Sequence, residues 1–300
     1  MKLDIDIVAA GGGSLFPVQL GVVDVLQEDP RFEIRRAAGT SAGSILAGGL
    51  AFGLTVEKAL DLCVRVLRNN VLMDPPSWWM ALRLYRFYGL HSFDPLRKEL
   101  GRHLGDAMRL SSFEDWGAHV FSLKERGPIF VRASTHPLVN PAELIAASCA
   151  IPWMVNTRTI GGMDGRFWDG GIVANFPLDC WDDKPNRLTV GIRALGPPSS
   201  EPVDSVFDAA RATAEGLLWA SNNAHGSCKS RSSVIEVEIH GNALDFSLSE
   251  REVIRRYDAG RVGANRWLRS PETRNLLKRQ HHFADDPDDD ESEVTTKCLV

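Results

Sequence analysis

Gly39-Thr40-Ser41-Ala42-Gly43 stands between a short run with Ile34, Ala37 and Ala38, residues 34–38, and an apolar run, residues 45–54. A short strand, a G-x-S-x-G turn and a helix in this order predict a nucleophile elbow. Glycine is needed on both sides of the serine because the sharp turn brings strand and helix too close for a Cβ. The turn would expose the Ser41 hydroxyl beside the first amides of the helix, which favour negative charge. The same five residues also fit an ordinary glycine-rich turn before a helix.

A second glycine cluster lies near the start of the chain. Residues 2–10 have the pattern of a buried strand and lead into Gly11, Gly12 and Gly13, after which a helical pattern begins. Three consecutive glycines leave backbone N–H groups uncovered, which suits an oxyanion hole or a phosphate cradle. Phe16 replaces the last glycine of a dinucleotide fingerprint, and the Gly-Lys-Ser/Thr of a P-loop is absent. We therefore expect this glycine loop to form an oxyanion hole.

An aspartate at the end of a short predicted strand is the third element. It occurs in Trp168-Asp169-Gly170-Gly171, shortly after a second aspartate in Asp164-Gly165. Asp-Gly is a favoured two-residue connection between strands, so we assign Asp164 to a hairpin turn and Asp169 to the chemistry. Taken alone, Asp169 fits a turn aspartate better than a catalytic one.

Together these segments resemble the patatin-like phospholipase family. The resemblance spans residues 7–177, with weaker agreement to about residue 268, and it is carried by four motifs in order: the glycine loop, the elbow, Ala147-Ser148-Cys149-Ala150-Ile151-Pro152, and Asp169-Gly170-Gly171 followed by Asn175-Phe176-Pro177. The resemblance implies an α/β class fold with three α/β/α layers and a mostly parallel sheet. It further implies a catalytic dyad, with Ser41 as nucleophile and Asp169 as its partner, that hydrolyses acyl esters of phospholipids or lysophospholipids.

The glycine loop departs from the family at one position. An arginine or lysine usually stands two places after the third glycine, and here that residue is Leu15. We therefore expect a positive charge near the loop to be lost. This departure leaves open a patatin-fold binding or regulatory protein with weak activity. Backbone amides alone can still form the hole, and the presence of Ser41 and Asp169 argues against an inactive protein.

The main rival is a Ser-Asp-His esterase of the α/β-hydrolase type, in which serine, acid and histidine follow in that order. Four histidines follow Asp169, namely His225, His240, His281 and His282. They lie in a polar segment, at a strand end and before an acidic tail, so we expect surface positions. A dyad without histidine suffices for an ester if the carboxylate takes the serine proton and returns it to the leaving alkoxide.

Length and composition fit one large domain. The chain has 300 residues, of which 44% are hydrophobic and 24% charged. We expect a hydrolase domain over residues 1–280 and an acidic, disordered tail over residues 281–300. No run approaches the roughly 18 apolar residues of a membrane span, and we find no signal peptide. The cysteines are scattered and indicate reduced thiols: Cys63, Cys149, Cys180, Cys228 and Cys298. These features predict a cytoplasmic protein with no cofactor, metal site or nucleic-acid partner.

Residues 71–88 combine a proline break, adjacent tryptophans and arginines. Tryptophan and tyrosine favour the headgroup level of a bilayer, and arginine binds lipid phosphate. On this interpretation Trp78, Trp79, Arg83 and Arg86 contact the inner membrane surface, where the protein would bind peripherally. A tryptophan-rich helix that simply packs in the core is equally compatible with the pattern.

Overall fold

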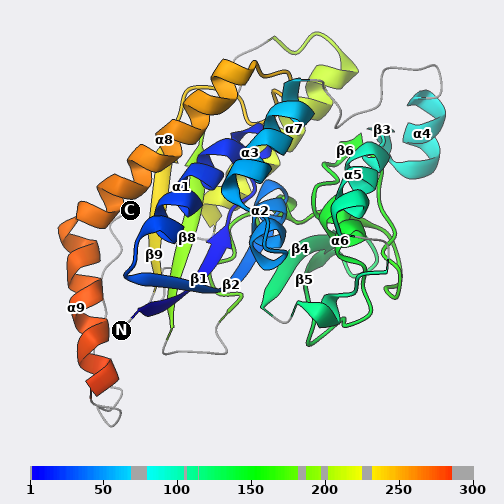
Figure 1. Ribbon diagram of the computed structural model, residues 1–300. Coiled ribbons are helices and arrows are strands. Elements are labelled where there is room, and N and C mark those ends of the chain that lie inside the picture. The colour runs from blue at the N-terminus through cyan, green and yellow to red at the C-terminus, as the bar shows by residue number, and fades with distance from the viewer. Residues whose placement is uncertain are drawn as a thin grey trace.

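The computed structural model describes residues 2–68, 80–104, 107–113, 115–181, 187–196, 202–224 and 232–285. Within these residues a central sheet has the strand order β5-β4-β2-β1-β8-β9, with β7 beside β4 (Figure 1). The strands are β1 (Leu3–Ala9), β2 (Phe32–Thr40), β4 (Trp116–Ser122), β5 (Gly127–Arg132), β7 (Phe167–Asp169), β8 (Leu188–Leu195) and β9 (Ser232–Glu238). All neighbours are parallel except that β5 and β7 run antiparallel to β4. The predicted mostly parallel sheet is confirmed.

Helices cover one face of this sheet (Figure 1). These are α1 (Phe16–Glu28), α2 (Ala42–Ala51) and α8 (Glu250–Arg269), with α3 (Val56–Arg68) packed on α1. Alternate residues of the strands, such as Ile5 and Ile7, point toward these helices and are fully buried. A parallel sheet buries both faces, and the last five residues of both β1 and β2 are buried.

The other face of the sheet is covered by the segment that follows β7. Val8 and Ala38 pack there against Phe176 and Trp181. This segment includes the short helix η3 (Gly170–Ile172) and lies against α7 (Val206–Ala224). The three layers of the predicted α/β/α fold are therefore present.

A smaller unit lies at one side of the sheet (Figure 1). It contains α4 (Met80–Phe87), β3 (Gly89–His91), α5 (Asp94–Leu104), α6 (Pro141–Ser148) and β6 (Trp153–Val155), and β3 pairs with β6 in a two-stranded parallel sheet. The short helix η2 (Leu110–Ser112) precedes β4, whereas the short helix η1 (Gly13–Leu15) lies between β1 and α1. Neither α5 nor the small sheet was predicted from the sequence.

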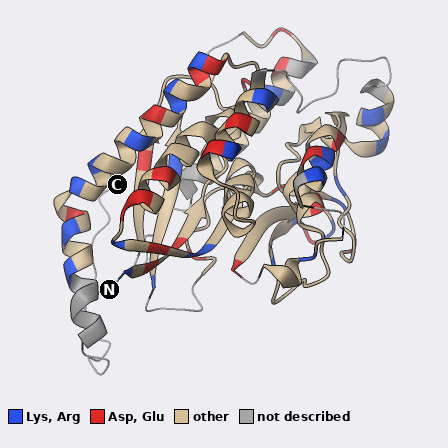
Figure 2. Ribbon diagram, in the orientation of Figure 1, with Lys and Arg blue, Asp and Glu red and all other residues tan. Residues whose placement is uncertain are grey.

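The C-terminal part of the described chain is helical. Ser249 caps α8 by accepting a hydrogen bond from the Glu252 N–H, as the capping-box pattern indicates. After Ser270 a further helix, α9 (Pro271–Asp285), runs across the expected boundary at residue 280. Charged residues recur along α8 and α3 (Figure 2). None of the helices in the described ranges is long and apolar enough to cross a membrane.

Candidate active site

Ser41 lies at a strained turn between β2 and α2. Its φ of 53° and ψ of −125° place it in a region that residues with a side chain rarely adopt. A Cβ on Gly39 would lie 2.1 Å from the carbonyl oxygen of Gly43, and a Cβ on Gly43 would lie 2.2 Å from that of Ala9. Both positions therefore require glycine, and the turn has the backbone of the predicted nucleophile elbow.

Ser148, at the end of α6, holds this elbow in place. The Ser41 N–H donates to Ser148 Oγ at 2.9 Å, and the Ser148 hydroxyl donates to the His119 carbonyl oxygen at 2.7 Å. On the helix side, the Ser44 hydroxyl donates to the Ser41 carbonyl oxygen at 2.6 Å. These buried hydrogen bonds fix the backbone of Ser41 without using its hydroxyl. Ser148 belongs to the third motif of the sequence, which by itself suggested no role for this residue.

Two strands meet end to end beside β4 and bring Ser41 and Asp169 together. Strand β2 pairs with the first half of β4 in parallel, and its last residue, Thr40, lies opposite His119. Strand β7 pairs with the second half of β4 in the antiparallel sense, and its last residue, Asp169, lies opposite Val120. Because their carboxyl ends point toward each other, Ser41 and Asp169 occupy adjacent places along β4.

The Asp169 carboxyl group is almost completely buried. Burial raises the pKa of Asp169 to about 7, although hydrogen bonding from Ser41 and from the Gly171 N–H opposes the increase. The Gly171 N–H donates to Oδ1 at 2.7 Å. Oδ2 has no hydrogen bond of full geometry in the described part of the chain. A carboxylate with a pKa near neutral pH has the basicity of a general base.

The nearby histidine, His119, is not part of this group. It precedes Val120 on β4, so its side chain points to the opposite face of the sheet from Asp169. There its ring stacks on Phe130 with 4.5 Å between centroids. Of the predicted surface histidines, His240 is exposed at the end of β9. His225 and the side chains of His281 and His282 lie outside the described residues.

The glycine loop lies directly against Ser41. A Cβ on Gly11 would come within 3.2 Å of the Ser41 Cβ. The Gly11 N–H donates to the Asn175 carbonyl oxygen at 3.0 Å, and Asn175 Nδ2 donates to the Gly11 carbonyl oxygen at 3.2 Å. The N–H groups of Gly12 and Gly13 have no acceptor within the described residues. The loop thus has two amides that a ligand oxygen could use, and Gly11 serves to attach the loop to Asn175.

A buried arginine from α8 reaches the residue that follows the glycines. Arg256 is 2% exposed, and its Nη1 donates to the carbonyl oxygen and the hydroxyl of Ser14, each at 2.9 Å. Its Nε lies 3.2 Å from Glu252, whose carboxylate also binds Arg255 at 2.7 Å. One carboxylate between two guanidinium groups leaves a net positive charge beside the loop. The expectation that the loop lacks such a charge is therefore wrong: Leu15 is buried in the core, and Arg256 provides the charge.

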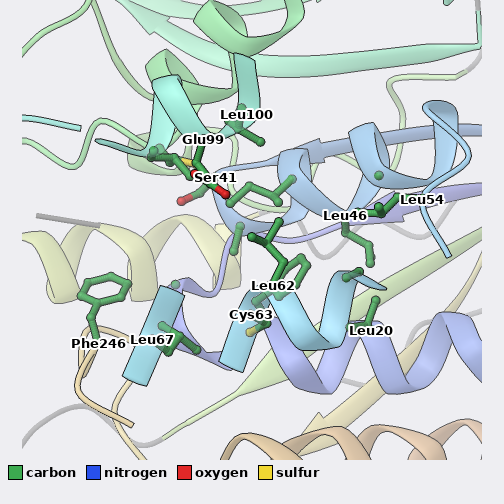
Figure 3. A pocket seen from close by; sticks show the side chains of 18 of the residues that line it. Leu20, Ser41, Leu46, Leu54, Leu62, Cys63, Leu67, Glu99, Leu100 and Phe246 are labelled. Carbon is green, nitrogen blue, oxygen red and sulfur yellow. The ribbon is translucent and has the colours of Figure 1, made fainter. Parts of the chain in front are cut away.

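An apolar cavity of ≈ 120 Å³ opens at Ser41 (Figure 3). It follows α2 from Ser41 to Leu54, and α2 alone is about 15 Å long. Apart from Ser41, Glu99 and two cysteines, the side chains that line it are hydrocarbon, and they include Phe16, Leu20, Val23, Leu46, Leu50, Leu62, Leu67, Phe93, Leu96, Leu100 and Phe246. Such a cavity accepts an aliphatic chain and excludes polar groups from most of its length.

The thiol of Cys149 lines the same cavity as Ser41. Burial raises the pKa of Cys149, and the nearby charge of Asp169 raises it further. The thiol therefore stays protonated and does not compete with Ser41 as a nucleophile. In the ranges that the structure describes, no group of three or more His, Cys, Asp or Glu side chains could hold a metal ion.

The predicted membrane segment is described only in part. Trp78 and Trp79 lie outside the described residues. Arg83 lines a second, polar pocket, whereas Arg86 is exposed, with its guanidinium carbon 5.9 Å from the centroid of the Phe87 ring. Membrane contact by these four residues stays a prediction.

Comparisons with known proteins agree with this architecture. A family model described as patatin-like phospholipase matches residues 7–180. YqhO of Bacillus subtilis (strain 168) is 23% identical over 291 residues, which cover 86% of this chain and 95% of YqhO. R571 of Acanthamoeba polyphaga mimivirus is 25% identical over 198 residues, covering 61% of this chain and 63% of R571. The crystal structure of VipD from Legionella pneumophila superimposes with a TM-score of 0.53 at 15% identity, over 92% of this chain and 67% of VipD. The likeness to VipD concerns the fold alone, and the predicted patatin-like fold is confirmed.

Proposed function

The chain belongs to the patatin-like phospholipase family, and on that premise we propose that it is a carboxylic ester hydrolase that removes acyl chains from membrane phospholipids or lysophospholipids. Family membership supports a lipid acyl hydrolase in general. The observation that carries the finer proposal is the meeting of β2 and β7 beside β4, which puts Ser41 and Asp169 together at one end of an apolar cavity.

In the proposed mechanism Ser41 and Asp169 act as a dyad. Asp169 takes the proton of the Ser41 hydroxyl while Ser41 Oγ attacks the ester carbonyl carbon. The tetrahedral intermediate then releases the alcohol, which receives that proton from Asp169, and leaves an acyl group on Ser41. Water attacks this acyl-enzyme with Asp169 again as the base, which frees the fatty acid and returns the proton to Ser41. A pKa of about 7 lets Asp169 both accept and donate the proton near neutral pH.

The negative oxygen of the tetrahedral intermediate needs hydrogen-bond donors. We assign this role to the N–H groups of Gly12 and Gly13, supported by the N-terminal end of α2. The N–H of Gly11 does not take this role, because it donates to the carbonyl oxygen of Asn175; Gly11 instead attaches the loop to Asn175. Arg256 is a positioning residue that holds Ser14 and places positive charge behind the loop. The acyl chain of the substrate would occupy the cavity along α2, away from water.

Covalent labelling tests the nucleophile. A fluorophosphonate probe should label the wild-type chain and the exposed control variant Ser247→Ala, but not Ser41→Ala. Loss of the nucleophile should lower fatty-acid release from mixed phospholipid vesicles by about 10³-fold or more, measured by mass spectrometry of the lipids. Persistent labelling of a folded Ser41→Ala variant would refute the assignment. Labelling of the wild type without any lipid product would instead favour a patatin-fold binding or regulatory protein.

A further inference from the structure

A second pocket, which we call the arginine pocket, lies beside α5. It has a volume of about 490 Å³ and is lined by Arg83, Arg97, Arg158 and Arg166. These residues come from α4, from α5, from the segment after β6 and from the residue before β7, so the fold gathers four distant arginines. No residue lines both this pocket and the Ser41 cavity among those described.

Helix α5 is a common wall of the two pockets. Its residues Leu96 and Leu100 line the Ser41 cavity, whereas Asp94 and Arg97 line the arginine pocket. The two sets lie on different faces of the helix, as their spacing requires. The arginine pocket is therefore a separate, polar site next to the apolar one.

The carboxylates in the arginine pocket do not balance its arginines. The acids that line it, among the residues described, are Asp94 and Glu143. Asp94 Oδ1 accepts a hydrogen bond from Arg158 at 2.8 Å, while Arg97 Nε lies 3.9 Å from the same oxygen. Glu143 Oε2 accepts the N–H of Gly161 at 2.9 Å. Among the described residues that line the pocket, arginines therefore outnumber carboxylates.

Neutral groups hold the guanidinium group of Arg166 in place. Arg166 Nη1 donates to the Thr157 hydroxyl at 3.1 Å, and its guanidinium carbon lies 5.6 Å from the centroid of the Phe87 ring. Arg158 is mostly buried, with 14% of its side chain exposed. A guanidinium carries five N–H donors, and those that remain after such contacts favour a planar or tetrahedral oxyanion.

We propose that the arginine pocket binds a phosphate group, at a site distinct from the Ser41–Asp169 dyad. Guanidinium groups bind phosphate oxygens in pairs, and the negative charge of a phosphate group suits a pocket lined mainly by arginines. The phosphate could belong to a soluble compound or to a lipid headgroup. Helix α4 carries Arg83 and also exposes Leu82 and Tyr85, the latter 85% exposed, which supports a lipid source. This binding goes beyond the proposed ester hydrolysis and does not depend on it.

Titration of the full-length chain with inorganic phosphate at constant ionic strength, set with chloride, tests the site. Phosphate should raise the melting temperature in a saturable way and broaden its own ³¹P resonance. The Kd should increase about tenfold or more in Arg97→Gln, which removes a charged hydrogen-bond donor. Arg65→Gln, which removes the same charge from an exposed site on α3, should bind as the wild type does. Ser41→Ala should also bind normally, which separates this site from the proposed hydrolysis.

Vesicle flotation distinguishes the two sources of phosphate. If a lipid headgroup is bound, the chain should float with vesicles that contain phosphatidic acid but not with pure phosphatidylcholine, and free phosphate should compete. Binding of free phosphate without flotation would identify a soluble phosphate compound. Arg83→Gln, in a different helix, provides a second variant if Arg97→Gln does not fold. The proposal is overturned if neither phosphate nor phosphatidic acid binds, or if the folded variants bind as tightly as the wild type.

Discussion

Asp169 should make the folded protein less stable as the pH rises, which is the opposite of most acidic side chains. Burial raises its pKa from 3.8 to about 7. The folded chain therefore keeps a proton on Asp169 between about pH 4 and pH 7, where the unfolded chain has lost it. Because the folded state binds more protons in this range, the free energy of unfolding falls as the pH increases through it.

The size of the effect follows from the two pKa values. A rise from 3.8 to about 7 makes ionisation of Asp169 less favourable in the folded chain by about 4 kcal/mol. Asparagine has nearly the shape of the protonated acid and cannot ionise. Asp169→Asn should therefore match the wild type in stability near pH 4 and exceed it by up to about 4 kcal/mol above pH 7. The same substitution should abolish ester hydrolysis, because it removes the proposed base.

Urea unfolding of wild type and Asp169→Asn at pH 5 and pH 8 measures this difference. Asp164→Asn is a matched control, because Asp164 is exposed in the turn before β7 and its hydrogen bond from Lys124 lowers its pKa. Its stabilising contribution is complete above 3.8 and is lost only at lower pH, so its effect should not change between pH 5 and pH 8. A stability difference between Asp169→Asn and wild type that is the same at both pH values would refute the raised pKa.

The pH dependence of catalysis provides an independent measurement of the same group. If Asp169 acts as the base, kcat/KM on a small soluble ester should increase about tenfold per pH unit below about 7 and then become constant. A profile that is flat from pH 5 to pH 8 would argue against Asp169 as the base.

Three further predictions concern the loop, the cavity and the absence of a histidine from the dyad. Arg256→Gln removes two charged hydrogen bonds to Ser14, so it should lower the free energy of unfolding by about 3–5 kcal/mol and kcat by about tenfold or more. The control Arg255→Gln, at a neighbouring exposed residue, should change the free energy of unfolding by less than about 1 kcal/mol. If the two variants have the same effect in denaturation and in ester hydrolysis, the role of Arg256 is contradicted. Gly49→Leu places a side chain in the Ser41 cavity at a position where a Cβ has only ordinary contacts. It should reduce the hydrolysis of long-chain nitrophenyl esters but not of nitrophenyl butyrate, and Gly216→Leu on α7 is the control. An equal loss of activity on the long-chain and the butyrate ester would show that the acyl chain of the substrate binds elsewhere. His240→Ala and treatment with a chelator should each leave ester hydrolysis nearly unchanged, and a loss of several hundredfold from either would favour a triad or a metal-dependent mechanism.

Local patterns in the sequence determined much of the fold. The glycines at positions 39 and 43 are required by backbone contacts of 2.1–2.2 Å that would occur with any Cβ, and these contacts arise within one strand-turn-helix unit or with its neighbour strand. Strand β1 was readable because Ile5, Ile7 and Val8 are apolar and a parallel sheet buries both faces. The smaller unit with α5 and β3 was not predicted, because its short elements have little periodicity and depend on packing against one another.

The sequence alone thus identified Ser41 and Asp169 as candidates, since each carries its own local signature of a turn and glycines. Only the tertiary structure decided that β2 and β7 meet end to end beside β4, that burial raises the pKa of Asp169, and that a cavity follows α2. From the sequence, the glycine loop was expected to lack a positive charge because Leu15 replaces a basic residue. In the structure Arg256 of α8, 242 residues away from Ser14, provides a positive charge beside the loop. Such a contact has no local pattern, because what brings the two residues together is the packing of α8 on α1 and not their spacing along the chain.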